Sequence, residues 1–223
     1  MKTFIQKMKL IVICFAVFFL LEIPVFAESR TLGVNVFGGY SLLISSEGVR
    51  SNSVIYTDSK FTNKSTVLGG YFNYMFLEPE WAGIEISIRK YQMDLKISDN
   101  DYGTLKMLPL IVGIKLQDFP TKPGWAWHGG LGIGLSINKF EKTSYLINLE
   151  KNNADLDFNV KTSFVMDMGG GFDYFFTKKF SFTTDIRWLI NEPFIKYFYG
   201  NGDTYMEATA FHIYSGLTYW FKK

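Results

Sequence analysis

The chain of 223 residues contains one cysteine, two histidines and six prolines. Cys14 lies in the N-terminal apolar run, so the rest of the chain has no thiol for a disulfide or a cysteine-ligated metal site. After that run, no apolar stretch reaches the roughly twenty residues that a membrane-spanning helix needs. We expect no cofactor and no metal centre.

Residues 1–27 have the composition of a secretory signal peptide. Three lysines, at positions 2, 7 and 9, precede an uncharged run at 10–21, and small residues precede a cleavage site after Ala27. The alternative is a transmembrane anchor, but about twelve uninterrupted apolar residues are too few to span a bilayer. We expect cleavage after Ala27 and a single domain over residues 28–223.

Residues 28–223 carry equal numbers of basic and acidic side chains, so charge does not indicate a nucleic-acid partner. Their main feature is the alternation of apolar with polar or small residues. It is clearest at 158–176 and 180–190, which are joined by the turn 177–179. Side chains of a strand alternate between its two faces. Each of these stretches is long enough to supply the roughly 9–11 residues that a transmembrane β-strand needs.

The same alternation predicts eight strands, at 32–43, 66–76, 82–89, 105–116, 125–138, 158–176, 180–190 and 206–221. The connections between them alternate long and short, beginning and ending with a long one. An up-and-down membrane barrel has this pattern when its short turns face the periplasm. We predict an all-β, eight-stranded antiparallel transmembrane barrel, closed because lipid cannot satisfy a free strand edge. Pro109 lacks a ladder donor, so we expect a β-bulge there.

A membrane barrel has its apolar face outside and its polar face inside, whereas a soluble, lipocalin-like barrel has the opposite arrangement. The polar face is rich in glycine, which suits a narrow interior, and the apolar face carries aromatic residues near the strand ends, as interfacial belts do. We favour the membrane barrel, with Ile84, Leu131 and Phe172 facing outward and Asp167 and Arg187 inward. Aromatic residues expected in the belts are Trp125, Trp127, Phe158, Tyr174, Phe176, Phe180 and Tyr219.

Three segments, 169–176, 185–188 and 216–221, carry the sharpest motifs: GGGFDYFF, DIRW and GLTYWF. In these and in its overall pattern the chain resembles the eight-stranded outer-membrane barrels of the OmpA, OmpX and opacity-protein type, and more loosely the OmpW group. The resemblance implies an outer-membrane location. It also implies that Gly216, Tyr219 and Phe221 form the signal recognised by the barrel-assembly machinery.

The inward face carries charges of both signs, which must pair if eight strands enclose only a narrow lumen. Arg187 is expected opposite Gly169 and diagonal to Asp167. We predict a salt-bridged plug, with a conducting polar pore as the alternative. The predicted lumen charge network comprises Glu85, Arg89, Lys115, Lys161, Asp167, Asp173, Asp185 and Arg187.

No catalytic set emerges from the sequence. His128 and His212 both face inward, and no serine stands near either in a spacing typical of a lipid hydrolase, so we expect no enzyme activity. Asp99, Asn100 and Asp101 suit either a calcium site or, as we favour, a solvated loop tip.

We therefore expect a plugged barrel that serves envelope structure or surface interaction through four external loops. The partners implied are outer-membrane lipid, the assembly machinery and a host or surface ligand at the loops. Aromatic residues at 194 and 197–199 would contact such a ligand or anchor the loop at the membrane surface. The first alternative, implied by the OmpW likeness, is a passive conduit for small hydrophobic molecules. It requires an apolar pocket under the loops and a lateral gap, and a charged, continuously filled lumen would count against it. The second is an enzyme acting on outer-membrane lipid.

Overall fold

The structure is a computed structural model that describes residues 31–43, 49–51, 59–61, 64–77, 81–152, 158–196 and 204–222. The predicted signal peptide and its cleavage site after Ala27 lie outside these residues. Among the helices described, none is long and apolar enough to cross a membrane.

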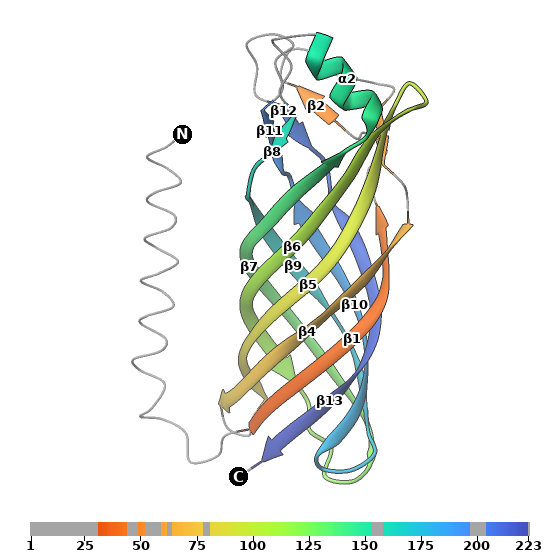
Figure 1. The fold of residues 1–223 in the computed structure, drawn as a ribbon. Coiled ribbons are helices and arrows are strands. Elements are labelled where there is room, and N and C mark those ends of the chain that lie inside the picture. Colours follow the sequence, from red (N-terminus) through yellow and green to blue (C-terminus); the bar gives the residue numbers. More distant parts are fainter. Residues whose placement is uncertain are drawn as a thin grey trace, which may run out of the picture.

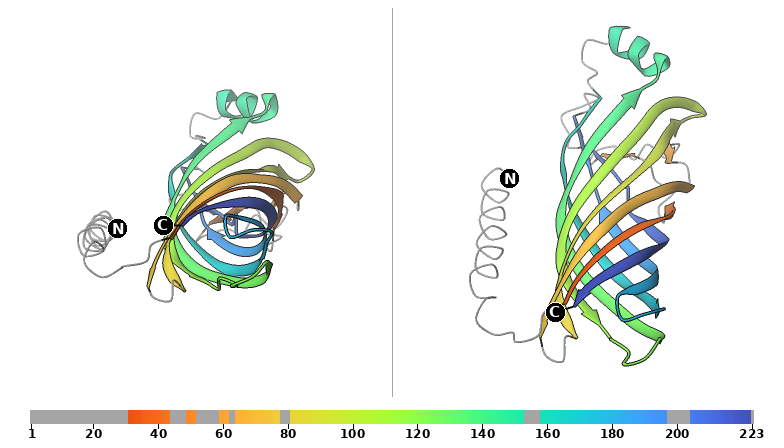
Figure 2. Two further views of the ribbon diagram at one scale, coloured as in Figure 1. Left: turned by 90° about the horizontal axis from the view of Figure 1, so that it is seen from below. Right: turned by 60° about the horizontal axis from the view of Figure 1, so that its bottom comes forward.

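Eight long strands form the wall of the molecule (Figure 1). They are β1 (Thr31–Leu43), β4 (Lys64–Leu77), β5 (Ala82–Ile97), β6 (Asn100–Gln117), β7 (Gly124–Lys142), β9 (Ser163–Phe175), β10 (Phe180–Asn191) and β13 (Ala210–Lys222). Each pairs antiparallel with its neighbours, and β1 pairs with both β4 and β13, which closes the ring. The view from below in Figure 2 shows the closed ring. The predicted eight-stranded antiparallel barrel is confirmed.

The two ends of the barrel differ in their connections. One end carries the short connections β4–β5, β6–β7 and β9–β10, together with the start of β1 and the end of β13 (Figure 1). The other carries α2 (Ser144–Asn152) and a four-stranded sheet in the order β2-β12-β11-β8. The small strands are β2 (Val49–Ser51), β3 (Ser59–Phe61), β8 (Asn159–Val160), β11 (Phe194–Lys196) and β12 (Thr204–Met206). Because outer-membrane barrels have short periplasmic turns and longer external loops, the α2 end is the external one.

The second external connection is not the loop that the sequence predicts. β5 and β6 continue to Ile97 and Asn100, and only Ser98 and Asp99 form the turn. Both have positive φ, of 48° and 64°, which is the conformation that two-residue hairpin turns require. The prediction of a long loop here is wrong, because its polar residues alternate along two extended strands.

The bulge predicted at Pro109 is also absent. The β5–β6 register runs from the pair Ile88 and Leu110 to the pair Tyr91 and Met107 without a shift, but no residues are paired between them. On its other side Pro109 pairs with Ser136 of β7. The missing N–H of proline therefore interrupts the ladder with β5 and leaves the register unchanged.

The prediction that the apolar face points outward and the polar face points into the barrel is confirmed. Leu131 is 63% exposed and Phe172 is 60% exposed on the outside of the barrel, whereas Asp167 and Arg187 are 3% and 2% exposed inside it. Apolar residues dominate the outer face of the wall, which becomes polar towards the external ends of the strands, as it does on β5 beyond Ile88. A soluble barrel would show the opposite arrangement, so this wall is built to lie in hydrocarbon.

Two strand boundaries differ from the prediction, and both lie at the external end. The sixth wall strand begins at Ser163, and Phe158 is buried in the loop region and does not belong to an outer aromatic belt. The last wall strand begins at Ala210, because Met206 belongs to β12 of the small sheet. In both cases the alternation continues from the wall into a second, separate sheet, where it no longer indicates lumen and lipid faces.

We predict that Gly169→Val destabilises the barrel by about 3 kcal/mol. A Cβ at Gly169 would lie 2.1 Å from the carbonyl oxygen of Ile186 and 2.8 Å from Cδ of Arg187. Gly129→Ala is the control, because its Cβ would meet nothing closer than 3.5 Å. Urea unfolding in lipid vesicles measures both changes, and equal stability of the two variants would contradict the prediction.

Candidate functional site

The lumen is the candidate site, and a layer of charged side chains crosses it. At its centre Arg89 of β5 forms a two-pronged ion pair with Asp167 of β9, with Nη1–Oδ1 and Nη2–Oδ2 distances of 2.7 and 2.8 Å. Both residues are buried. Paired guanidinium and carboxylate groups of this geometry are among the strongest ion pairs in proteins, so this pair ties two strands together across the lumen.

Arg187 connects three carboxylates around this central pair. Its Nε donates to Asp185 at 2.8 Å, and its two terminal nitrogens lie 3.4 Å from Asp167 and from Glu85. The Nζ of Lys115 lies 3.6 Å from the same Glu85 carboxylate. The network therefore joins β5, β6, β9 and β10 through buried charges.

His128 extends the layer towards the periplasmic end. Its Nδ1 lies 2.8 Å from Asp173, and its Nε2 lies 2.9 Å from Asp185. Asp173 also accepts hydrogen bonds from Gln117 at 2.9 Å and from Thr183. We use the name charge layer for the whole set, in which four carboxylates face three cations and one histidine: Glu85, Arg89, Lys115, His128, Asp167, Asp173, Asp185 and Arg187.

The structure thus brings together seven of the eight residues predicted from the sequence. The prediction for Lys161 is wrong. Lys161 is exposed, it precedes β9, and its Nζ lies 5.3 Å from the ring centre of Phe194 in β11. The alternation from which it was placed inside the barrel stops before Ser163, where the wall begins.

The sequence did not assign His128 to the network, although its position was read correctly. Alternation placed it inward, but its two carboxylate partners lie on β9 and β10, and only the cross-lumen geometry brings them together. His212 faces the same interior and packs its ring edge-on against Tyr91, with ring centres 4.7 Å apart. In the described part of the chain, no group of histidine, cysteine or acidic residues is arranged to hold a metal ion.

Above the charge layer most side chains in the lumen are apolar. A small buried polar group lies among them, in which Ser163 donates a hydrogen bond to Asn191 and Asn191 donates to the hydroxyl of Tyr91. The upper apolar cluster is rich in methionine and aliphatic side chains from β5, β6 and the small sheet. It meets the charge layer at aromatic rings, with Lys115 4.4 Å from the ring centre of Tyr71 and Arg89 5.7 Å from that of Tyr214. Its most enclosed members include Val67, Tyr91, Met93, Leu95, Leu105, Met107, Leu146, Val165, Leu189, Met206 and Ala208.

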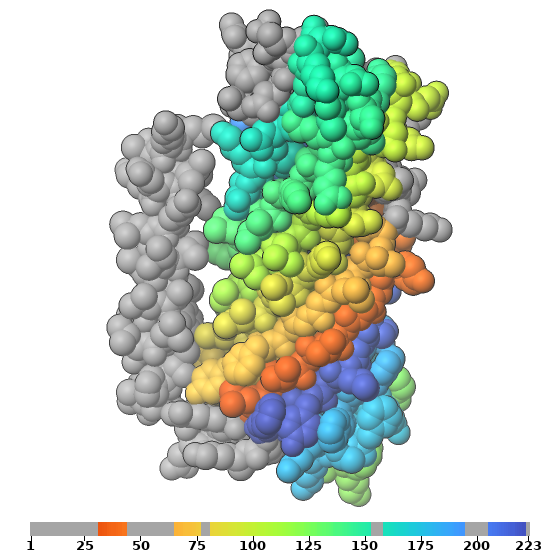
Figure 3. All heavy atoms as spheres, viewed as in Figure 1, coloured from red at the N-terminus to blue at the C-terminus, as the bar shows by residue number. Residues whose placement is uncertain are grey.

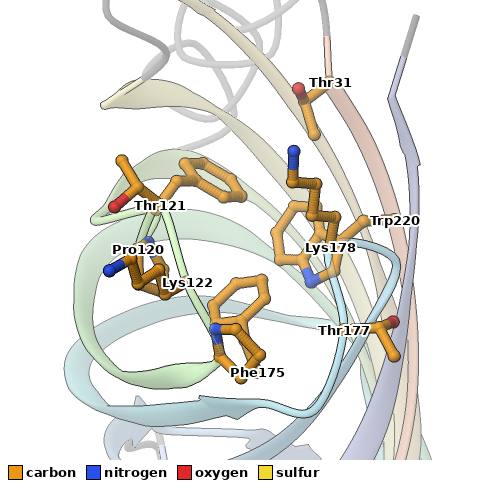
Figure 4. A pocket seen from close by; sticks show the side chains of 10 residues that line it. Thr31, Pro120, Thr121, Lys122, Phe175, Thr177, Lys178 and Trp220 are labelled. Carbon is orange, nitrogen blue, oxygen red and sulfur yellow. The ribbon is translucent and has the colours of Figure 1, made fainter.

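Below the charge layer a second group of aromatic side chains closes the lumen. Trp220 of β13 packs against Phe175 of β9 and Phe119 of the β6–β7 turn, with ring centres 6.1 and 5.0 Å apart. Beneath these rings lies an open periplasmic pocket of about 280 Å³, shown in Figure 4, with Lys122 and Lys178 at its edge. The lumen therefore has three zones: an aromatic floor, the charge layer and the upper apolar cluster.

The residues of the predicted assembly signal lie near the end of β13. Tyr219 and Phe221 face outward with ring centres 4.5 Å apart, at the periplasmic end of the wall. Gly216 sits where a Cβ would meet the carbonyl oxygen of Val36 at 2.3 Å. Of the aromatic residues predicted in the last external loop, Phe194 packs against Tyr205 in the small sheet, and those at 197–199 lie outside the described residues.

Comparison with solved structures identifies the class of the fold. The chain is similar to the outer membrane protein OprG from Pseudomonas aeruginosa, with a TM-score of 0.65, 18% identity and coverage of 89% of this chain and 98% of that one. It is also similar to the outer membrane protein AlkL (TM-score 0.52, 12% identity, 89% and 92% covered) and to outer membrane protein W of E. coli (TM-score 0.51, 16% identity, 88% and 100% covered).

Neither a protein-family model nor a curated protein sequence matches the chain. The structural likenesses nevertheless agree with the geometry of the wall, which is closed, apolar outside and charged inside. The protein is an eight-stranded β-barrel of the outer membrane.

We predict that Asp167→Asn destabilises the barrel by about 3–5 kcal/mol, because it leaves Arg89 buried without its charge partner. Glu141→Gln is the control, since it removes an ion pair with Lys106 in which both side chains are more than a third exposed. Such surface pairs contribute about 0–1 kcal/mol. Urea unfolding in vesicles distinguishes the two, and a small effect at Asp167 would show that the charge layer contributes little to stability.

Proposed function

We propose that the barrel is a conduit that carries small hydrophobic molecules from the cell surface into the outer membrane. The observation that carries the proposal is the division of the lumen into an apolar upper part and a charged lower part. Small apolar solutes would be accepted by the upper part. They would be stopped by the charge layer, where displacing paired charges costs too much.

The composition of the upper apolar cluster supports this role. Side chains fill it, which counts against a permanently open passage, so transport requires that these side chains move when a solute enters. Met93, Met107 and Met206 are among its most enclosed members. Methionine has three rotatable bonds and a polarisable sulfur, so it adapts its shape to irregular apolar neighbours. A cluster built in this way can rearrange around a small guest more easily than one of branched side chains.

We propose that the exit is lateral and lies at the boundary between the two zones. The β5–β6 ladder is interrupted between the pairs Ile88–Leu110 and Tyr91–Met107, where Pro109 has no N–H to donate. The interruption lies beside Arg89, the first charge below the apolar cluster. A molecule stopped there would pass sideways between the two strands into the lipid, without crossing the charge layer.

A second candidate function is surface interaction or envelope structure. It is favoured by the external end, where the connections between the wall strands contain regular secondary structure, namely α2 and the sheet β2-β12-β11-β8. Such structures can present side chains to a host or surface ligand. For both functions we propose outer-membrane lipid and the assembly machinery as partners, and no enzymatic activity.

We predict that the purified protein passes no steady ion current in a planar bilayer. Three carboxylates of the charge layer are paired with lysine or arginine and Asp173 is paired with His128. The rings of Phe119, Phe175 and Trp220 close the lumen beneath them. Such a filled lumen offers ions no hydrated path. Sustained, salt-dependent conductance steps would overturn the plug.

We predict that vesicles containing the protein take up a small hydrophobic fluorescent probe several-fold faster than empty vesicles. Pro109→Val should slow uptake, because the valine N–H can complete the β5–β6 ladder and narrow the exit. Pro123→Val in a periplasmic turn is the control and should leave the rate unchanged. Equal rates for Pro109→Val and the unaltered protein would refute the lateral exit, and no uptake above empty vesicles would favour the surface role.

A further inference from the structure

On three adjacent wall strands the outward apolar run ends, towards the external end, in a lysine. Towards the external end, the outward side chains are Ile84, Ile86, Ile88 and Lys90 on β5, Val112, Leu110, Leu108 and Lys106 on β6, and Leu135, Ile137 and Lys139 on β7. These strands lie side by side as the yellow to green bands of Figure 3. We call Lys90, Lys106 and Lys139 the lysine rim.

The register places the three lysines together. Lys106 is the partner of Lys139, and directly below them Leu108 is the partner of Ile137. Lys90 lies two residues before Gln92, the partner of Lys106. The rim is therefore a continuous row across three strands, immediately above the apolar wall.

The acidic groups on this face do not cancel its charge. Glu141 lies 2.5 Å from Lys106 and 3.8 Å from Lys139. A hydrogen bond from Lys106, together with the charges of Lys106, Lys139 and Lys90, lowers the pKa of Glu141 below its usual value. One carboxylate is thus shared among three cations. Two further acids lie nearer the tip of the β5–β6 hairpin. Asp94 accepts a hydrogen bond from Thr104, and Asp101 is the cross-strand partner of Lys96, which is not a lysine of the rim.

Other sectors of the wall end differently. On β10 the outward residue that follows Ile190 is Glu192, and on β4 the outward residue that follows Leu68 is Thr66. The described residues therefore show a basic sector over β5, β6 and β7, and this sector differs from β4 beside it and from β10 elsewhere in the wall. If every apolar run had to end in a lysine at the membrane surface, β4 and β10 would also carry one at these positions.

We propose that the lysine rim binds the phosphate groups of a phosphorylated glycolipid in the outer leaflet. The apolar belt of an outer-membrane barrel is about 25 Å tall, and the side chains just above its external edge lie at the level of the lipid headgroups. Lysine stems extend along the apolar surface and carry the ammonium groups to that level. Clusters of such lysines attract anionic lipids, and phosphates on one glycolipid can span neighbouring strands. The proposal does not depend on transport through the lumen.

The test is the titration of diphosphorylated lipid A into the full barrel, purified in a neutral detergent. We expect the variant Lys90→Gln, Lys106→Gln, Lys139→Gln to bind about 100-fold more weakly, the loss expected for three lysines at an anionic lipid surface. The matched control is Lys122→Gln, Lys178→Gln, Lys179→Gln. It removes the same charge from exposed positions at the periplasmic end and should bind as the unaltered protein does.

A second variant keeps the test decisive if the triple variant folds poorly. Glu141→Gln removes the one carboxylate shared by the rim and should tighten lipid A binding several-fold. Dephosphorylated lipid A should bind about as weakly as the triple variant binds lipid A, and excess inorganic phosphate should compete poorly, because it lacks the acyl chains that lie against Ile88 and Ile137. Equal binding by the triple variant, or unchanged binding by Glu141→Gln, would overturn the proposal, as would equal binding of the dephosphorylated lipid.

Discussion

The narrow lumen is the constraint on which the rest of this structure depends. Eight strands enclose just enough room for side chains, so every charge that faces inward loses its water and needs a partner. The partners come from across the barrel: Arg89 of β5 reaches Asp167 of β9, and Arg187 of β10 reaches Glu85 of β5. These pairs fix the spacing of strands that share no hydrogen-bonded ladder, and they make the lower lumen a solid cross-section.

Alternation in the sequence was enough to predict the barrel, because a period of two assigns each side chain to lipid or lumen. It was also enough to predict that Arg187 lies opposite Gly169, which the register confirms. Alternation fails where the chain leaves the wall. Lys161 and Phe158 continue the pattern of β9, but they belong to the external structures, where two faces no longer separate lipid from lumen. Nothing in their local sequence marks that change.

The height of each inward residue was the second quantity that the sequence could not supply. Polar residues around position 99 indicate a loop, so the sequence does not identify Met93 and Leu95 as lumen residues. In the structure β5 and β6 continue above the bilayer, where both outer and hairpin positions are polar but the interior is still enclosed. Much of the upper apolar cluster therefore comes from segments whose outward residues are polar and do not face lipid. There the sequence does not show the usual pattern of an apolar outer face and a polar inner face. For the same reason, the conduit is favoured only once the strands are placed in space.

The two-residue turn at Ser98 and Asp99 has a consequence for how the molecule meets its surroundings. It joins two extended strands, so β5 and β6 end in an ordered hairpin and not in an irregular loop. Because the backbone of this hairpin is already ordered, binding of a partner to it costs little conformational entropy. A foreign peptide can therefore be inserted at its exposed tip, because an insertion in a surface turn leaves the register of the wall beneath unchanged.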